Sequence, residues 1–254
     1  MFNLFERSSR KFLFWGLFFF LIVFLTFLFF HPKFYTEERI ENLNYRLLDN
    51  EEIYRISLNE LKSGDIILDK PISYGDRYIY QQQFDETINN RFIFFLYYNI
   101  FEFLIDSMGE GNYWHSFVYV GDGRMNSLSL KGVDEENFTI YFTNSYYFIV
   151  LRPIVSEEVR NEAIEKTNID LKNKNIKYSF RNGLLIVFSR ATGINLNYKI
   201  KDDELVCSSY AASLYHSLKF NGKDYKYVTP IDLFDEDLTK IVMAKTRRGF
   251  YYGK

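Results

Sequence analysis

Cysteine, histidine and proline are scarce in this sequence of 254 residues, which holds one cysteine, three histidines and four prolines. A single cysteine excludes a disulfide framework within the chain and a zinc site built from several thiolates. The three histidines, at positions 31, 115 and 216, form no cluster that could hold a transition metal. The sequence therefore predicts no metal ion and no other cofactor.

A surplus of either charge is missing as well. The chain carries 31 basic and 33 acidic residues, a formal net charge of −2. Because nucleic-acid binding depends on a basic face, this balance excludes a generic nucleic-acid-binding protein. Aromatic residues, by contrast, are abundant, with 27 Phe and 21 Tyr, and such a composition is typical of an ordered protein rather than a disordered one.

Residues 12–30 form an uncharged and strongly apolar run, FLFWGLFFFLIVFLTFLFF. A helix of this length spans about 28 Å, close to the hydrocarbon thickness of a bilayer. The run leads into His31 and Pro32 without the small residues that mark a signal-peptide cleavage site. The sequence therefore predicts an uncleaved transmembrane helix, a signal-anchor.

Basic residues precede this run, at Arg7, Arg10 and Lys11. The positive-inside rule therefore places residues 1–11 in the cytoplasm. The part of the chain after the anchor is expected on the non-cytoplasmic side, in the periplasm or outside the cell if the organism is bacterial. The membrane is accordingly an expected partner.

After the anchor, residues 31–57 are expected to form a lead-in helix or stalk, with a polar helix over 36–50. Residues 58–254 contain no repeat and no low-complexity linker, so we expect one domain, of the α+β class. Its strands are expected from residue 65, on both sides of Asp122-Gly123, and at 146–153 and 240–245; its helices are expected at about 157–171, 178–190 and 204–219.

A long insert, residues 70–114, separates the first strand from the next. Residues 76–110 have a helical pattern, and Phe92 to Ile105 is almost wholly apolar but too short to span a bilayer. A connection of this length is unusual in a compact domain. Its helix either completes the core, or it covers a substrate groove or contacts the membrane.

Cys207 opens an apolar helical segment, CSSYAASLYHSL. The dipole of a helix lowers the pKa of a thiol in its first turn and so favours the nucleophilic thiolate. The acidic run Asp202, Asp203 and Glu204 just before it opposes this effect, so the thiol would need an imidazolium partner. The alternative is that a lone cysteine on a helix is a small buried hydrophobic residue.

Only one of the three histidines suits this partnership. His216 follows Cys207 by nine residues in the same helix, which places it about 13 Å along the axis. His31 adjoins the membrane anchor. His115 begins a strand, next to Trp114, and is therefore the candidate general base.

Five segments, LKSGDIIL, HSFVYVGDGRM, NIKYSF, ELVCSSYAASLY and TPIDLF, occur in this order over about residues 58–245. In this order they resemble the permuted papain-like amidases of the YiiX/YaeF type, relatives of the NlpC-type cysteine peptidases and of the lecithin–retinol acyltransferase group. The resemblance implies a circularly permuted papain-like fold, an antiparallel sheet with packed helices. It also implies Cys207 as nucleophile and His115 as base.

The resemblance leaves the third catalytic residue open. In the wider superfamily a polar residue twelve positions after the histidine orients it; here that position is Ser127, and Asn126 precedes it. A change of one residue in the hairpin register decides which of them shares the face of His115. Tyr178, in NIKYSF, matches a family position expected to line the site.

Two further residues are substrate-binding candidates. Asn112, near the strand that begins at His115, is a candidate oxyanion donor, and Trp114 flanks the histidine. Both contribute to the site only if the insert brings them to the thiol.

Taken with the anchor, the resemblance implies a membrane-anchored cysteine hydrolase that cleaves amide bonds in a cell-wall peptide or a lipid-linked amide. Two alternatives stay open. One is a thiol-dependent acyltransferase that acts on membrane lipids. The other is a binding module that retains the fold without catalysis.

Overall fold

The computed structural model describes residues 43–71, 115–139, 146–192, 198–246 and 248–253. All of them belong to one compact unit that comprises residues 36–254. The predicted anchor at 12–30 and most of the insert at 70–114 lie outside the described residues. Within the described ranges, no helix combines the length and the apolar character that crossing a membrane requires.

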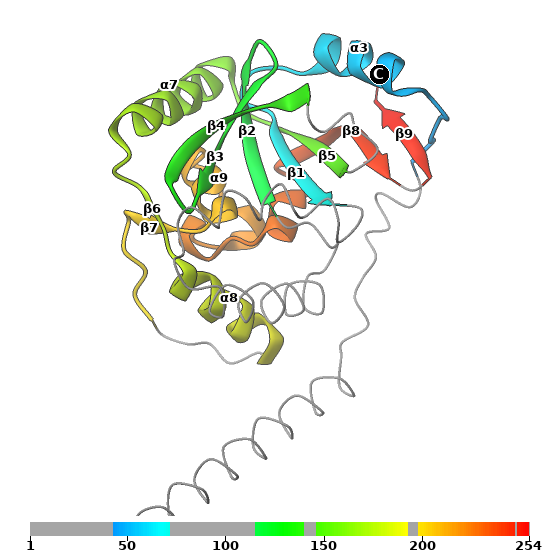
Figure 1. The fold of residues 1–254 in the computed structure, drawn as a ribbon. Helices are drawn as coiled ribbons and strands as arrows, with labels where there is room; N and C mark the ends of the chain where they lie inside the picture. Colours follow the sequence, from blue (N-terminus) through cyan, green and yellow to red (C-terminus); the bar gives the residue numbers. More distant parts are fainter. Residues whose placement is uncertain (1–42, 72–114, 140–145, 193–197, 247, 254) are drawn as a thin grey trace, which may run out of the picture. The chain divides into compact units, whose positions relative to one another are not determined.

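In the described part of the chain, seven strands form one sheet in the order β4-β3-β2-β1-β5-β8-β9 (Figure 1). Each neighbouring pair in it is antiparallel. The strands are β1 (Ile66–Pro71), β2 (His115–Gly121), β3 (Arg124–Ser129), β4 (Gly132–Asn137), β5 (Tyr146–Pro153), β8 (Thr239–Thr246) and β9 (Gly249–Tyr252). A short parallel pair, β6 (Lys177–Tyr178) with β7 (Glu204–Leu205), stands apart. The prediction of an α+β chain with an antiparallel sheet is confirmed.

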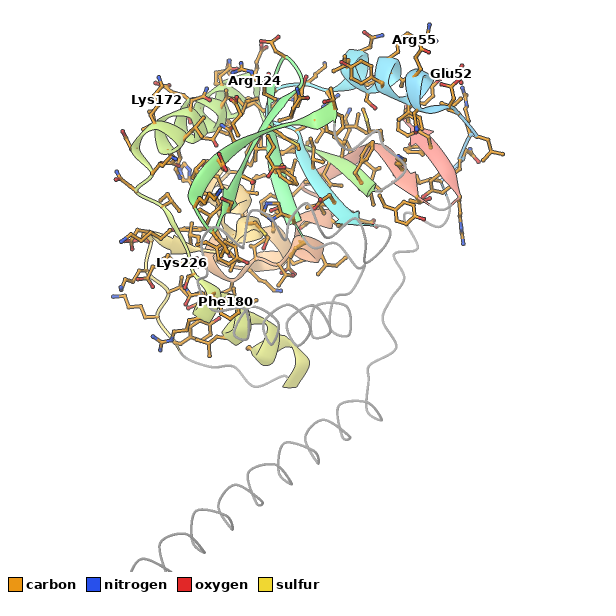
Figure 2. The ribbon with its side chains drawn as sticks, in the orientation of Figure 1. Glu52, Arg55, Arg124, Lys172, Phe180 and Lys226 are labelled. Carbon is orange, nitrogen blue, oxygen red and sulfur yellow. The ribbon has the colours of Figure 1, made fainter. Side chains whose placement is uncertain are left out.

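The helices of the described residues are few and mostly short. They are α3 (Asn50–Glu60), α7 (Glu157–Asn173), α8 (Phe180–Thr192) and α9 (Cys207–Leu214), with 3₁₀ turns η3 (Phe220–Gly222), η4 (Tyr225–Tyr227) and η5 (Pro230–Phe234). Side-chain caps fix the starts of the first two: Asp49 accepts from the Glu52 amide at 2.8 Å, and Ser156 from the Val159 amide at 3.4 Å. Charged side chains such as Glu52, Arg55 and Lys172 project outward from the ribbon (Figure 2).

The hairpin between β2 and β3 forms where the sequence predicts it. Its turn carries positive φ at three successive residues, Gly121 (104°), Asp122 (53°) and Gly123 (73°). Glycine and aspartate tolerate this region better than other residues, and tight hairpin turns require it. This turn sets the pairing register of β2 with β3.

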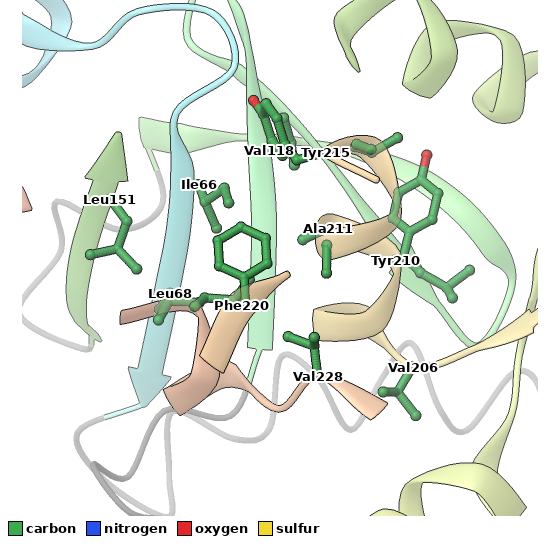
Figure 3. Packing of buried hydrophobic residues seen from close by; sticks show 14 of the residues in the cluster. Ile66, Leu68, Val118, Leu151, Val206, Tyr210, Ala211, Tyr215, Phe220 and Val228 are labelled. Atoms are coloured by element: carbon green, nitrogen blue, oxygen red, sulfur yellow. The ribbon is translucent and has the colours of Figure 1, made fainter. Parts of the chain in front are cut away.

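The sheet separates two apolar layers, because successive side chains of a strand point to opposite faces. Ile66, Leu68 and Val118 lie on one face together with the buried residues of α9, and we call this the α9 face. Ile67 and Phe117 lie on the other with Ile53 of α3, and we call it the α3 face. Figure 3 shows the α9 face, with Ala211 and Phe220 packed toward Ile66 and Leu68.

The start of β1 is fixed by a buried ion pair. Arg152 donates to both carboxylate oxygens of Asp65, each at 2.7 Å, and also to the Glu60 carbonyl. The neighbouring Gly64 has φ of +91°, and its carbonyl accepts a hydrogen bond from the Tyr215 hydroxyl. A β-carbon at position 64 would approach that hydroxyl to 2.8 Å, so only glycine fits here.

Two predicted helices differ from the structure. Residues 43–49 are not helical, because the Arg46 amide and carbonyl pair with Phe250 of β9 at 2.7 and 2.9 Å and draw this segment onto the sheet. The helix follows instead, as α3. The predicted helix over 204–219 is the shorter α9, because β7 takes up its first residues and the chain turns at Tyr215.

Candidate functional site

Cys207 is the first residue of α9 and is 5% exposed. Its preceding residue, Val206, provides no side-chain cap, so the first amide groups of the helix are not satisfied from within the helix. Two serine hydroxyl groups hydrogen-bond the start of α9 to the segment around η4. Ser208 donates to the Val228 carbonyl at 2.8 Å, and Ser209 donates to the Lys226 carbonyl at 2.9 Å. The thiol is therefore held at a rigid helix terminus.

The acidic run before Cys207 lies outside α9, and two of its carboxylates have cationic partners. Asp202 forms an ion pair with Lys226 at 2.6 Å and accepts from the Tyr225 hydroxyl at 2.9 Å. Glu204 belongs to β7 and pairs with Lys201 at 2.6 Å. Because each of these two carboxylates has a nearby cation, their charge opposes a thiolate at Cys207 less than the sequence suggests.

The end of β2 that carries His115 is open on one side. The pairing of β2 with β3 runs from Gly121–Arg124 to Val118–Asn126 and does not reach residues 115–117 within the described part of the chain. On its other side β2 stays paired with β1 down to His115. A gap in the hydrogen-bond ladder therefore lies beside Ser116, on the side of β3.

The Cys207 thiol lies beside this gap. The Tyr119 amide donates to the backbone carbonyl of Asp65, just before β1, at 2.8 Å, so it points toward β1. Because the direction of the amides alternates along a strand, the amide of Ser116 points the other way, toward β3. That amide hydrogen-bonds to the Cys207 sulfur and favours its thiolate. Since strand amides lie in the plane of the sheet, the sulfur sits at the edge of β2 rather than above one face.

Burial dominates the acidity of the thiol and raises the pKa of Cys207 to about 11. The amides of Ser116 and Ser208 act in the opposite direction, whereas the charge of Asp69 raises this pKa further. The Ser116 hydroxyl lies near enough to favour the thiolate, but it makes no hydrogen bond of ordinary geometry with a described residue. The thiol is therefore protonated at neutral pH.

His115 begins β2, and its ring meets that of Phe117 edge-on, with the centroids 4.5 Å apart. This contact places the imidazole on the α3 face, as does the alternation of β2. His115 is half-buried, and the desolvation of its ring lowers the pKa of the imidazole to about 4. At neutral pH the imidazole is therefore uncharged, which is the form that accepts a proton. The structure brings Cys207 to Ser116, the residue that follows His115.

The register also places the two candidates for the third residue. Asn126 pairs with Val118, so it lies on the α9 face, where its amide nitrogen donates to the Thr167 hydroxyl at 3.4 Å. Ser127 lies on the opposite face, the one that His115 shares. Its buried hydroxyl has no hydrogen-bond partner among the described residues. Position therefore favours Ser127 over Asn126, while its role stays a prediction.

The remaining candidate residues lie in different parts of the chain. Tyr178 pairs with Leu205 in the β6–β7 ladder and packs against the α9-face core, close in the chain to the start of α9. Asn112 and Trp114 lie outside the described residues. His216 is exposed just after α9. In the described ranges, no group of three or more histidine, cysteine, aspartate or glutamate side chains is placed to hold a metal ion.

One buried acid near the site was not predicted from the sequence. Asp69 of β1 has no exposed surface, lies opposite His115 in the β1–β2 register, and acts on the Cys207 thiol through its charge. In the sequence, Asp69 directly follows the apolar run Ile66-Ile67-Leu68. An acid in that position is equally typical of an exposed turn that ends a strand, so the sequence alone does not mark it as buried.

Comparison with known proteins adds no relative to this description. The sequence matches no protein-family model and no curated protein. The likeness to permuted papain-like amidases thus depends on the five segments themselves and on the site that they form.

Proposed function

We propose that this protein is a cysteine hydrolase of the permuted papain-like type that cleaves amide bonds, with Cys207 as nucleophile and His115 as general base. The observation that carries the proposal is the position of a helix-opening thiol against the open end of β2, one residue from His115. The chain order supports it as well, since the histidine hairpin precedes the cysteine helix and α9 packs on β2 and β3.

The reaction would proceed in two steps. The neutral imidazole of His115 takes the proton from the Cys207 sulfur, which attacks the amide carbonyl carbon. The C–N bond then breaks, the amine leaves with the proton from His115, and a thioester remains. In the second step His115 takes a proton from water, whose oxygen attacks the thioester; the carboxylic acid leaves and the thiol regains its proton.

The start of α9 suits the transition state of both steps. Negative charge develops on the carbonyl oxygen next to the sulfur, where the uncapped amides at the helix N-terminus point. Donors fixed in a buried site stabilise such a charge more than water does. The Cys207 amide is therefore the proposed oxyanion donor.

The protonation states assign His115 the role of a base rather than of a standing imidazolium. A preformed ion pair would need a thiol pKa below that of the imidazole, whereas burial puts the two at about 11 and about 4. Proton transfer then occurs when substrate is bound and the imidazole comes within hydrogen-bond reach of the sulfur. A substrate-like electrophile should consequently react with Cys207 faster than a small alkylating agent does.

Turnover by the full chain in detergent micelles tests this proposal. A panel of peptide amides and of long-chain N-acyl amines would be incubated with wild type, Cys207→Ser, His115→Gln and His216→Gln. We expect the first two variants to lose at least about 10²-fold in kcat/KM and His216→Gln to match wild type. Equal activity in Cys207→Ser would overturn the assignment. An added amine that captures the acyl group in place of water would identify an acyltransferase.

The topology is part of the same proposal. Residues 12–30 would anchor the chain, with the catalytic domain on the non-cytoplasmic side. Protease added to intact cells should then digest the domain, and full protection would contradict this orientation.

A binding module is the second candidate function, and one observation favours it. A buried thiol with a pKa of about 11 and an imidazole with a pKa of about 4 are also what an unreactive core would show. In that case Cys207→Ser would bind the same peptide or lipid amides as wild type, and neither protein would turn them over.

A further inference from the structure

Asp69 of β1 lies directly opposite His115 of β2. The two residues are direct partners in the antiparallel ladder of β1 and β2, so their side chains rise from the same face. Residues opposed in this way have Cβ atoms about 4.5–5.5 Å apart, within reach of a carboxylate-to-imidazole hydrogen bond. Asp69 has no exposed surface, so its polar atoms depend on protein partners rather than on solvent.

Strand β3, on the other side of β2, offers only a weaker group to orient the His115 imidazole. The pairing of β2 with β3 ends at Val118, three residues before the strand end at His115. Asn126 is bound to Thr167 on the other face. The hydroxyl of Ser127 carries no charge, and an imidazole gains less from it than from a carboxylate. The strand that remains paired with β2 at His115 is β1, and it presents Asp69.

We propose that Asp69 is the positioning residue for His115, an inference that depends on the proposed function. The Asp69 carboxylate accepts a hydrogen bond from one ring nitrogen of His115. This fixes the tautomer that leaves the other nitrogen unprotonated, so that it can take the proton of the Cys207 thiol. The catalytic set would then come from β1, β2 and α9, with its acid on the strand before the histidine instead of the strand after it.

Two other ionisable groups bear on the design of a test. Lys245 of β8 lies on the same face two strands away, since Asp69 pairs with Phe148 and Phe148 with Lys245. The Cys207 thiol lies at the start of α9, and the charge of Asp69 raises its pKa. Any test must therefore separate an effect on His115 from an effect of the charge on the thiol.

The two effects have opposite signs. The negative charge of Asp69 disfavours the thiolate, so Asp69→Asn would speed the reaction of Cys207 if Asp69 acted through its field alone. If Asp69 positions His115, the same variant slows turnover, because the amide can donate to the ring and stabilise the wrong tautomer. Loss of an orienting carboxylate costs roughly 10²–10⁴-fold in turnover. The sign of the change thus distinguishes the two roles.

The experiment uses the full chain in micelles with ¹⁵N-labelled histidine. Long-range ¹H–¹⁵N spectra report the tautomer of His115, assigned by its loss in His115→Gln. Asp69→Asn should change this tautomer and lower turnover at least about 10²-fold, while Asp122→Asn, the same change at a side chain that is 91% exposed, should change neither. Asp69→Glu, which keeps the carboxylate, should restore the wild-type tautomer.

Each other outcome is decisive. An unchanged His115 spectrum in Asp69→Asn overturns the proposal, and so does a changed spectrum with unchanged or faster turnover. If wild type shows no turnover, the proposed function fails while the spectra still decide whether Asp69 holds the imidazole. If Asp69→Asn does not fold, the wild-type spectrum decides. A single tautomer with a slowly exchanging ring proton is expected, and a mixture of tautomers would contradict the contact.

Discussion

One buried aspartate precedes β1 and another lies within it, and their surroundings differ. Asp65, directly before the strand, receives hydrogen bonds from Arg152 on both carboxylate oxygens. Asp69, near the other end, lies opposite His115 and acts on the Cys207 thiol through its charge. Neither carboxylate side chain has exposed surface. Burial therefore does not separate the structural role of Asp65 from the functional role that we propose for Asp69, whereas the partner of each acid does.

Burial raises the pKa of Asp65, and the Arg152 guanidinium, which is always charged, opposes this and favours the carboxylate, so the role of this acid is structural. An imidazole and a thiol, in contrast, both change their protonation state during acyl transfer. The Asp65 end of β1 should therefore respond to substitution mainly in the free energy of unfolding. The Asp69 end should respond mainly in turnover.

The largest effect on stability is expected from Arg152→Met. This change leaves the buried Asp65 carboxylate without the cation that hydrogen-bonds to both of its oxygens, which costs about 3–5 kcal/mol of unfolding free energy. Urea unfolding followed by tyrosine fluorescence measures the loss. The control is Lys226→Met, which removes the partner of Asp202, a side chain that is 82% exposed, and should cost at most about 1 kcal/mol. Equal losses would erase the distinction between the buried and the exposed pair.

A glycine substitution at the same end should come next. Gly64→Ala combines a φ of +91° with a contact of 2.8 Å to the Tyr215 hydroxyl, so we expect a loss of about 2–4 kcal/mol. Gly222→Ala has a similar φ of +71° but open space around its β-carbon, and should cost about 1 kcal/mol. If the two variants lose the same free energy of unfolding, backbone strain alone accounts for the loss, and the contact with Tyr215 contributes nothing.

The pH dependence of stability addresses the Asp69 end. The folded chain keeps His115 neutral down to about pH 4, whereas the unfolded chain protonates it near pH 6.5. Between these values unfolding takes up a proton, so the free energy of unfolding falls as the pH falls, by up to about 3 kcal/mol. His115→Gln should lose this part of the pH dependence. A wild-type profile that stays flat between pH 6.5 and 4 would show that the imidazole is solvated.

The sequence predicts the elements whose signals are local. Asp122-Gly123 marks the β2–β3 turn, and Ser156 marks the start of α7, because turn and cap chemistry depends on a few neighbouring residues. It misplaces the start of α9, since Glu204 and Leu205 are drawn into pairing with Lys177–Tyr178, far away in the chain. Such long-range pairing leaves no mark on local periodicity.

The candidate site shows the same limit. Cys207 and His115 stand out in the sequence because each residue type is rare and each begins an element. Asp69 does not, because its importance follows from the register of β1 against β2, which a single sequence does not encode locally. The same register decides that Ser127, and not Asn126, shares the face of His115.

The smallest effect is expected at Ser127, and it sharpens the comparison from the side of β3. Its hydroxyl is buried without a hydrogen-bond partner among the described residues, so Ser127→Ala removes an unsatisfied polar group. We expect its stability to change by less than about 0.5 kcal/mol, or to rise, because the folded state then no longer desolvates that hydroxyl.

Ser213→Ala is the matched control, since the Ser213 hydroxyl donates to the Tyr210 carbonyl at 2.8 Å. Losing that bond should cost about 1 kcal/mol. Urea unfolding of both variants, together with turnover, separates the two possible uses of Ser127. A stability loss in Ser127→Ala as large as that in Ser213→Ala would reveal a hydrogen bond to a residue outside the described ranges. A fall in turnover at unchanged stability would make Ser127 the residue that orients His115 and leave Asp69 without that role.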